Sequence, residues 1–230
     1  MLKDYVSNQL NIELTPKQEA LFEAYYNHLV KFNLHTNLTR IIDRNDADVK
    51  HFLDSMLLSK LLDMKHINSL CDMGAGAGFP SIPLLIIYPN LHVTIVESQI
   101  KRVNFLNELK VILKLNFEVV HERAEIYALK KQKSFDLVTA RALGELRLIL
   151  EYGIPMVKEK GYFIAPKGQK YQEEILDAEN ALKVLRSKVV KIDTFELIND
   201  AGFRANILIQ KLHHVENFPR AYAVIIKNRL

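Results

Sequence analysis

The chain has 230 residues, of which 49% are hydrophobic and 25% are charged, so it is long enough for one α/β domain with an additional segment and too apolar to be largely disordered. Its 31 Lys and Arg residues against 27 Asp and Glu residues give a net charge of +4, which permits a polyanionic partner without requiring one. The single cysteine, Cys71, excludes an internal disulfide, and no apolar run is long enough to cross a bilayer, so we expect a cytoplasmic protein.

The first 64 residues have the apolar spacing of helices. Residues 15–18 carry a start signal, because threonine can cap a helix, proline suits the first helical position and glutamine can complete a capping box. A second helix is predicted from about Asp46. His28 and His51 lie within these apolar stripes, where packed histidines are commoner than metal ligands, so we expect no metal site.

A glycine-rich run follows the first predicted strand, 67–71, and precedes a predicted helix. Gly74, Gly76 and Gly78 permit positive φ angles, and such a turn presents backbone N–H groups and a helix N-terminus to an electron-rich ligand. Glu97 ends the next predicted strand about 20 residues later, where nucleoside-binding folds place the carboxylate that binds a ribose. The two features together predict a nucleoside cofactor.

The glycine spacing also selects among cofactors. A dinucleotide fingerprint reads G-x-G-x-x-G, and Phe79 stands where that pattern has its third glycine, so the NAD pattern fails. A G-x-G-x-G loop suits a cofactor without phosphates, and S-adenosylmethionine is the common one. A turn that only connects a strand to a helix is the alternative for such a loop.

The remainder of the chain alternates between extended and helical segments, which is typical of a mainly parallel sheet. Its last two strands have a short connection and should pair antiparallel, as in class I methyltransferases. We therefore predict an α/β fold with a class I, Rossmann-like methyltransferase sheet in residues 65–230 and a helical cap, residues 1–64, packed on it. The predicted strands are 67–71, 92–97, 118–121, 135–140, 162–165, 189–197 and 205–212, and the predicted helices are 82–88, 99–115, 145–158 and 171–187.

In an open doubly wound sheet the ligand lies outside the carboxyl ends of the strands, so the residues that follow each strand are the site candidates. The glycine loop and Glu97 follow the first two predicted strands, and Glu125, Arg141 and Lys167 follow the next three. Solvated loop charges are the alternative for the last three residues.

At these positions the sequence resembles the glucose-inhibited division protein B family, also called RsmG, whose members methylate N7 of a guanine in bacterial small-subunit ribosomal RNA. The resemblance covers nearly the whole chain, and few other methyltransferases join Phe-Pro to the glycine loop as residues 79–80 do here. Ser81 departs from the family, which usually has glycine there, and the tail 227–230 lacks the usual proline before leucine. The matching segments are 37–40, His51 with 54–55, 74–80 with 82–83, 97–98 with Lys101, 105–106, 123–125, 141–142, 167–168 and 219–220.

The resemblance implies which residues bind the cofactor. Gly74 and Phe79 would border it, and Ala124 and Glu125 would meet its adenine side through backbone and side chain. We add Gly76 from the loop geometry and Glu97 from the ribose argument.

The resemblance also places Arg141 beside the transferred methyl group. N7 of guanine has an in-plane lone pair that needs no deprotonation, so alignment of the reactants is the main catalytic task, and no Ser-His-Asp or Cys-His set is required. Arg141 and Lys167 could hydrogen-bond guanine O6 or a phosphate, and we expect Arg141 to position the base. Phe79 is a candidate stacking surface for that base, with a competing role in packing the loop.

Two other functions stay open at this point. The chain could methylate a small molecule or a protein, or it could be a nucleotide-sensing regulator of cell division without enzymatic activity. The partner that we expect is 16S ribosomal RNA within the small ribosomal subunit, bound by a monomer without a membrane anchor or a metal.

Overall fold

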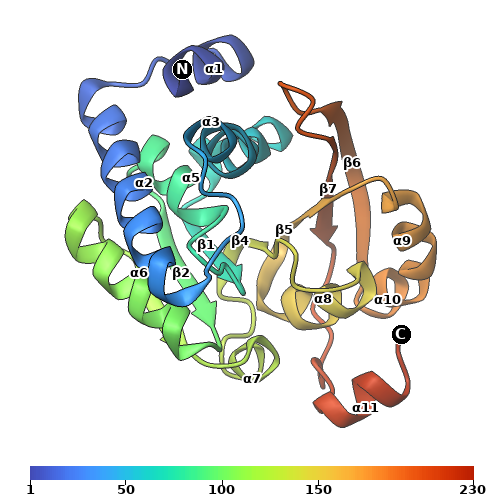
Figure 1. Cartoon of the computed structure of the whole chain (residues 1–230). Helices are drawn as coiled ribbons and strands as arrows, with labels where there is room; N and C mark the ends of the chain where they lie inside the picture. The colour runs from blue at the N-terminus through green and yellow to red at the C-terminus, as the bar shows by residue number, and fades with distance from the viewer.

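A seven-stranded mixed sheet forms the centre of the protein in the computed structural model, which describes residues 1–230 (Figure 1). The strand order is β3-β2-β1-β4-β5-β7-β6; the first five strands run parallel, and β7 runs antiparallel to β5 and β6. The predicted α/β architecture and the antiparallel pairing of the last two strands are therefore confirmed. The strands are β1 Ser69–Met73, β2 His92–Glu97, β3 Glu118–His121, β4 Phe135–Thr139, β5 Val157–Lys167, β6 Ser187–Glu196 and β7 Phe203–Lys211.

Helices cover both faces of the sheet, and Figure 1 shows α2 and α6 on one side and α8 and α10 on the other. The alternation of side chains along a strand explains the two layers, because Leu70 of β1 joins one apolar cluster while Cys71 and Met73 join the other. Cys71 is fully buried, as expected of a core residue. The helices after β1 are α5 Ser81–Ile87, α6 Ile100–Leu113, α7 Ala124–Lys130, α8 Leu146–Gly153, α9 Tyr171–Asp177, α10 Glu179–Val184 and α11 Tyr222–Lys227.

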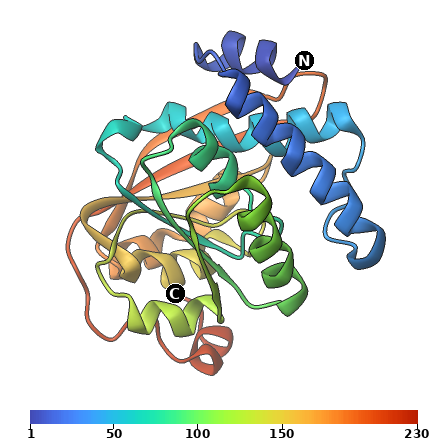
Figure 2. The same cartoon turned by 90° about the vertical axis from the view of Figure 1, so that its left-hand side faces the viewer.

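The N-terminal part is helical, as predicted, and its longest helix crosses one side of the molecule (Figure 2). The capping box of α2 is present: the Thr15 hydroxyl accepts from the Gln18 N–H at 3.3 Å, and the Gln18 side chain accepts from the Thr15 N–H at 2.9 Å. The elements before β1 are α1 Leu2–Leu10, α2 Pro16–Thr36, α3 Arg44–Ala47, a π-helical turn η1 Asp48–Leu53, α4 Asp54–Met56 and the 3₁₀ turns η2 Leu57–Leu61 and η3 Met64–His66.

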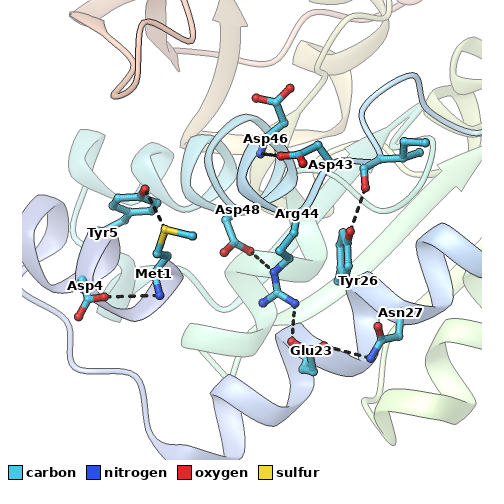
Figure 3. Close-up of polar contacts among 11 residues, drawn as sticks. Met1, Asp4, Tyr5, Glu23, Tyr26, Asn27, Asp43, Arg44, Asp46 and Asp48 are labelled. Atoms are coloured by element: carbon cyan, nitrogen blue, oxygen red, sulfur yellow. Dashed lines mark hydrogen bonds and ion pairs between the residues drawn. The ribbon is translucent and has the colours of Figure 1, made fainter.

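An ion-pair network connects these helices (Figure 3). Arg44 donates from Nε to Asp48 Oδ1 at 3.0 Å and also pairs with Glu23 of α2. Asp48 is 2% exposed, and burial raises the pKa of its carboxyl. A buried charge is costly without a partner, so Arg44 is what makes this position tolerable for Asp48.

The N-terminal helices share one apolar core with the sheet. A cluster of 36 buried residues extends from Leu2 and Phe22 to Ile164 and Leu208. Gln18 adds a polar link, since its side-chain amide donates to the Ile86 carbonyl at 2.9 Å. The helical part therefore packs directly on the sheet; the division into domains 1–64 and 65–230 stays a prediction.

Several element boundaries differ from the predicted ones. The predicted helix 145–158 ends at Gly153, a 3₁₀ turn η4 follows at Ile154–Met156, and β5 already begins at Val157. Pro155 has no backbone N–H to continue the helix, which explains the early end. The predicted helix 171–187 is divided into α9 and α10 at Ala178, and the helices α1, α7 and α11 were not predicted.

Candidate functional site

The glycine turn lies between β1 and α5 and adopts the left-handed backbone conformation that glycine permits. Gly74, Gly76 and Gly78 have φ angles of 68°, 61° and 95°. At Gly78 a Cβ atom would stand 2.8 Å from the hydroxyl of Tyr25, which donates a hydrogen bond to the Ala77 carbonyl, so a side chain is excluded there. At Gly76 a Cβ atom would meet nothing within 4 Å, so the backbone faces open space. The turn lines a cavity of 170 Å³.

Glu97, at the end of β2, binds the backbone of this turn. Its carboxylate is 2% exposed and accepts hydrogen bonds from the N–H of Gly76 at 3.1 Å and from the N–H of Gln99 at 2.9 Å. Arg102 Nη1 lies 3.6 Å from the same carboxylate. The two backbone donors fix the position of the Glu97 carboxylate and the orientation of the Gly76 peptide. Its bond to a ribose hydroxyl stays a prediction.

Phe79 packs the turn against the N-terminal helices. Its ring is 4% exposed and stacks on Tyr25 and His51 at centroid distances of 5.3 Å and 4.4 Å. The guanidinium carbon of Arg141 lies 5.2 Å from the same ring centroid. These contacts support the packing role of Phe79 over a role in stacking a base. His51, 7% exposed and bonded through Nε2 to the Thr39 hydroxyl at 3.0 Å, is a packed histidine, as expected.

A second cavity, of 500 Å³, lies beyond the ends of β2 and β3. It includes Ala124 and Glu125, the residues predicted to meet the adenine side. Glu125 is 8% exposed and pairs with the Arg123 guanidinium, which lies 4.3 Å from the ring centroid of Tyr222. The residues that line this cavity are Ser98, Arg123, Ala124, Glu125, Leu143, Leu148, Tyr152 and Tyr222.

Tyr152 and Tyr222 were missed by the sequence reasoning. Tyr152 lies within a predicted helix, where its spacing signals only packing, and Tyr222 lies in the tail, near the family-like residues 219–220. Burial raises the pKa of Tyr152 to about 12, so its hydroxyl stays protonated at neutral pH. Both tyrosines line a cavity that also contains two leucines and a few polar side chains, and an aromatic and apolar lining with a few polar groups suits a flat nucleobase.

Arg141 joins two cavities. It lines the cavity at the glycine turn and also a third cavity, of 430 Å³, beyond the ends of β4 and β5. Its Nη1 lies 3.4 Å from the Lys50 carbonyl oxygen and 3.4 Å from Asp54 Oδ2. Burial lowers the pKa of Arg141, but a guanidinium remains protonated at neutral pH.

Lys167 lines the third cavity, but its ammonium group already has protein partners. It donates to the Gly144 carbonyl at 2.8 Å and pairs with Glu174 Oε2 at 2.6 Å. These bonds hold the loop after β4 against α9, so Lys167 organises this cavity. A direct contact between Lys167 and a substrate stays a prediction.

Asp72 is a buried acid that the sequence reasoning also missed. It lies on β1 two residues before Gly74, is 0% exposed and accepts from the Ser81 N–H at 3.1 Å. Its other oxygen has no hydrogen-bond partner in the protein. Burial raises the pKa of Asp72 to about 7. Its signal in the sequence was a carboxylate inside an apolar strand next to the glycine turn.

The arrangement fits a nucleoside cofactor. The open backbone at Gly76 and the cavity with Glu125 and two tyrosines lie on the same edge of the sheet. Leu143 connects them, because it lines that cavity and its Cδ1 would be 2.7 Å from a Cβ atom at Gly74. No group of three or more His, Cys, Asp or Glu side chains is placed to hold a metal ion. None of the helices combines the length and apolar character that a membrane span requires.

Comparison with known proteins gives a family match over most of the chain. A family model described as rRNA small subunit methyltransferase G matches residues 18–200. The ribosomal RNA small subunit methyltransferase G of Acholeplasma laidlawii is 59% identical over 230 residues, covering 100% of both chains. That of Staphylococcus saprophyticus is 45% identical over 212 residues, covering 91% of this chain and 89% of the relative.

Solved structures agree with the fold. The crystal structure of M. jannaschii TYW2 in complex with AdoMet matches with a TM-score of 0.52 and 18% identity, over 64% of this chain and 69% of that one. At this identity the likeness concerns the fold alone. Together with the strand order, it confirms the predicted class I methyltransferase fold.

Proposed function

Because the chain belongs to the rRNA small subunit methyltransferase G family, we propose that it transfers a methyl group from S-adenosylmethionine to N7 of a guanine in 16S ribosomal RNA. The family and the fold confirm the predicted family membership, the enzyme class and the cofactor: this is an S-adenosylmethionine-dependent rRNA methyltransferase. Guanine N7 as the methyl acceptor comes from the family resemblance, and the observation in the structure that supports it is that Arg141 lines both the glycine-turn cavity and the cavity beyond β4 and β5.

We assign cofactor binding to the glycine turn and the neighbouring cavity. The backbone of Gly74 and Gly76 would lie against the cofactor, Glu97 would keep the turn in place and accept from the ribose, and Ala124 and Glu125 would contact the adenine. When bound, S-adenosylmethionine supplies an electrophilic methyl group on a positively charged sulfur. The protein's task is then to bring a nucleophilic nitrogen in line with that methyl group and to exclude water.

Arg141 would position the base. Guanine N7 attacks with a lone pair that needs no deprotonation, and the base becomes cationic as the new bond forms. A bare guanidinium close to N7 would oppose this charge, but Arg141 lies next to the carboxylate of Asp54. That carboxylate offsets the charge of Arg141 and also limits the directions in which the guanidinium can donate.

The proposed substrate is 16S ribosomal RNA within the small ribosomal subunit, and we propose that the protein acts as a monomer in the cytoplasm. The net charge of +4 supports a polyanionic partner. If lysine and arginine side chains contact phosphates, binding will weaken as the salt concentration rises.

The test is methyl transfer from radiolabelled S-adenosylmethionine to small ribosomal subunits that lack the modification, with naked 16S rRNA in parallel. We expect label at one guanine, and chain cleavage specific for 7-methylguanosine would locate it. Label on an exocyclic amine or on a ribose would refute the N7 assignment. Binding of the cofactor without transfer to any RNA would favour a regulator, and label recovered in a protein or a small molecule would favour another substrate class.

A further inference from the structure

The cavity beyond β4 and β5 is lined by residues from five separate parts of the chain. We call it the polar hollow. It has a volume of 430 Å³, within the range of about 300–1,000 Å³ that is usual for ligand sites. The residues that line it are Asp54, Arg141, Ala142, Gly144, Pro166, Lys167, Gly168, Glu174 and Arg204.

Its position in the sheet is the position expected for the second reactant. The 500 Å³ cavity that includes Ala124 and Glu125, which we call the adenine-side cavity, follows β2 and β3. The glycine turn follows β1, and the polar hollow follows β4 and β5 on the far side. Arg141 and Ala142 line both the glycine-turn cavity and the polar hollow. A base placed in the hollow would therefore lie next to Arg141, on the side of the glycine-turn cavity from which the methyl group is transferred.

The charges in the polar hollow are mixed. Three cations, Arg141, Lys167 and Arg204, stand with two carboxylates, Asp54 and Glu174. The two carboxylates offset most of the positive charge that would attract a phosphate, so the hollow is not built for the RNA backbone alone. Guanine suits such a lining, because it has O6 and N7 as acceptors and N1–H and the 2-amino group as donors.

The two carboxylates differ in how many of their oxygens accept hydrogen bonds from the protein. Asp54 accepts from Arg204 Nε at 3.1 Å with one oxygen and from Arg141 Nη1 at 3.4 Å with the other. Glu174 uses only Oε2, which receives the Lys167 ammonium at 2.6 Å and the Leu146 N–H at 2.8 Å. Its Oε1 makes no hydrogen bond within the protein. Glu174 is thus the carboxylate that is anchored on one side and free to accept on the other.

We propose that the polar hollow binds the target guanine and that Glu174 recognises its N1–H and 2-amino groups, which makes Glu174 a specificity-determining residue. This inference rests on the proposed function. Asp54 acts as a positioning residue for Arg141 and Arg204. Arg141 then lies on the side of O6 and N7, the edge of guanine that turns toward the cofactor.

The experiment compares guanine with inosine, which lacks the 2-amino group. Small subunits are reconstituted with 16S rRNA that carries inosine at the mapped target position, and kcat/KM is measured beside guanine subunits. We expect the wild-type protein to prefer guanine by about 10- to 100-fold, because the inosine complex loses a hydrogen bond to a charged acceptor.

The diagnostic variant is Glu174→Gln. Lys167 and the Leu146 N–H both donate, so the amide oxygen of glutamine will turn toward them and its NH₂ group will face the base, donor against donor. We expect kcat/KM for guanine to fall by about 10- to 100-fold and the preference over inosine to fall to within a few-fold of 1. The matched control is Glu173→Gln on the same helix, an exposed side chain outside the hollow, for which the preference should not change.

Three outcomes separate the possible failures. A wild-type protein that methylates guanine and inosine equally, or a Glu174→Gln variant that keeps the full preference, would overturn the inference and leave the proposed function standing. No transfer to any RNA by the wild-type protein would instead refute the proposed function. Binding of S-adenosylmethionine, measured by calorimetry, should be equal in wild type and Glu174→Gln, which shows that the variant is folded.

Discussion

Asp72 is a carboxylic acid in an apolar environment, with one hydrogen-bond donor, the Ser81 N–H, for its two oxygens. The ionised form loses its hydration on folding and is only partly compensated, which is why burial raises its pKa to about 7 from the ordinary value of about 3.9. The positive charge of Arg141 acts in the opposite direction and favours the ionised form of Asp72. The protonation of Asp72 is thus coupled to the residue that we assign to positioning the base.

The pH dependence of stability follows from this pKa. Between about pH 4 and pH 7 the folded protein retains a proton on Asp72 that the unfolded chain has lost, so this group lowers stability as the pH rises, by up to about 1.4 kcal/mol per pH unit. Asp72→Asn removes this pH-dependent contribution to stability and keeps an acceptor for the Ser81 N–H. We expect the free energy of unfolding of Asp72→Asn, relative to wild type, to increase from pH 5 to pH 8 in urea titrations. A difference that is constant over this range would contradict the assignment.

Arg141 is the second residue whose substitution is informative. Arg141→Ala should reduce the rate of methyl transfer at saturating substrates by about 100-fold or more, because the base is then no longer aligned. The affinity for S-adenosylmethionine should change less than the rate, since Arg141 lines the glycine-turn part of the proposed cofactor site but not the adenine-side cavity. Single-turnover transfer and calorimetry measure the two quantities. Arg147→Ala, which removes an arginine outside these cavities, is the control, and unchanged turnover of Arg141→Ala would reject the positioning role.

The C-terminal helix α11 is the element whose role is clear only from its position. Arg220, just before it, makes a bidentate pair with the buried Glu151, at 2.7 Å from Nε to Oε1 and 2.7 Å from Nη2 to Oε2. Ile225 is 1% exposed within the apolar cluster of α8 and α10. These contacts fix α11 on the sheet domain and bring Tyr222 to the adenine-side cavity.

Tyr222 should contribute to cofactor binding. An aromatic ring against a nucleobase is worth about 1–3 kcal/mol, so Tyr222→Ala should raise the dissociation constant of S-adenosylmethionine by about 5- to 150-fold in calorimetry. Ile226→Ala, at a 44% exposed side chain on the same helix, should leave it unchanged. Equal affinities of Tyr222→Ala and wild type would show that the ring has no part in the site.

At the scale of the whole molecule, the glycine-turn cavity, the adenine-side cavity and the polar hollow occupy neighbouring parts of one edge of the sheet, and the N-terminal helices add Asp54 and His51 to the same edge. The shared apolar core holds the two parts of the chain in one arrangement. We therefore expect ligand binding at this edge to stabilise both parts of the chain together and to raise the temperature of global unfolding.

The cofactor assignment can be tested on the intact protein by thermal unfolding. A ligand at about 100 times its dissociation constant stabilises the folded state by about 2.7 kcal/mol, which corresponds to an increase in Tm of about 5–11 °C for a protein of this size. S-adenosylmethionine should produce this increase, and NAD at the same concentration should not. An equal increase with NAD would contradict the interpretation of the glycine spacing.

The sequence by itself determined the features that local physics controls. The alternation of strands and helices follows from hydrophobic periodicity. The turn follows from Gly74, Gly76 and Gly78, since glycine permits the positive φ angles that all three residues adopt. The capping box at Thr15 was readable for the same reason, because its partners are three residues apart. The end of a helix was harder to predict: α8 ends at Gly153, before Pro155, and not at residue 158 as predicted.

Only the tertiary structure decided which side chains meet. Asp54, Glu174 and Arg204 come from distant parts of the chain, and their convergence in the polar hollow depends on strand order and helix packing. Tyr222 reaches the adenine-side cavity because Arg220 and Ile225 dock the tail. The physical reason is that periodicity reports which face of an element is buried, whereas a cavity is formed by several elements whose relative positions are set by the packing of the whole core.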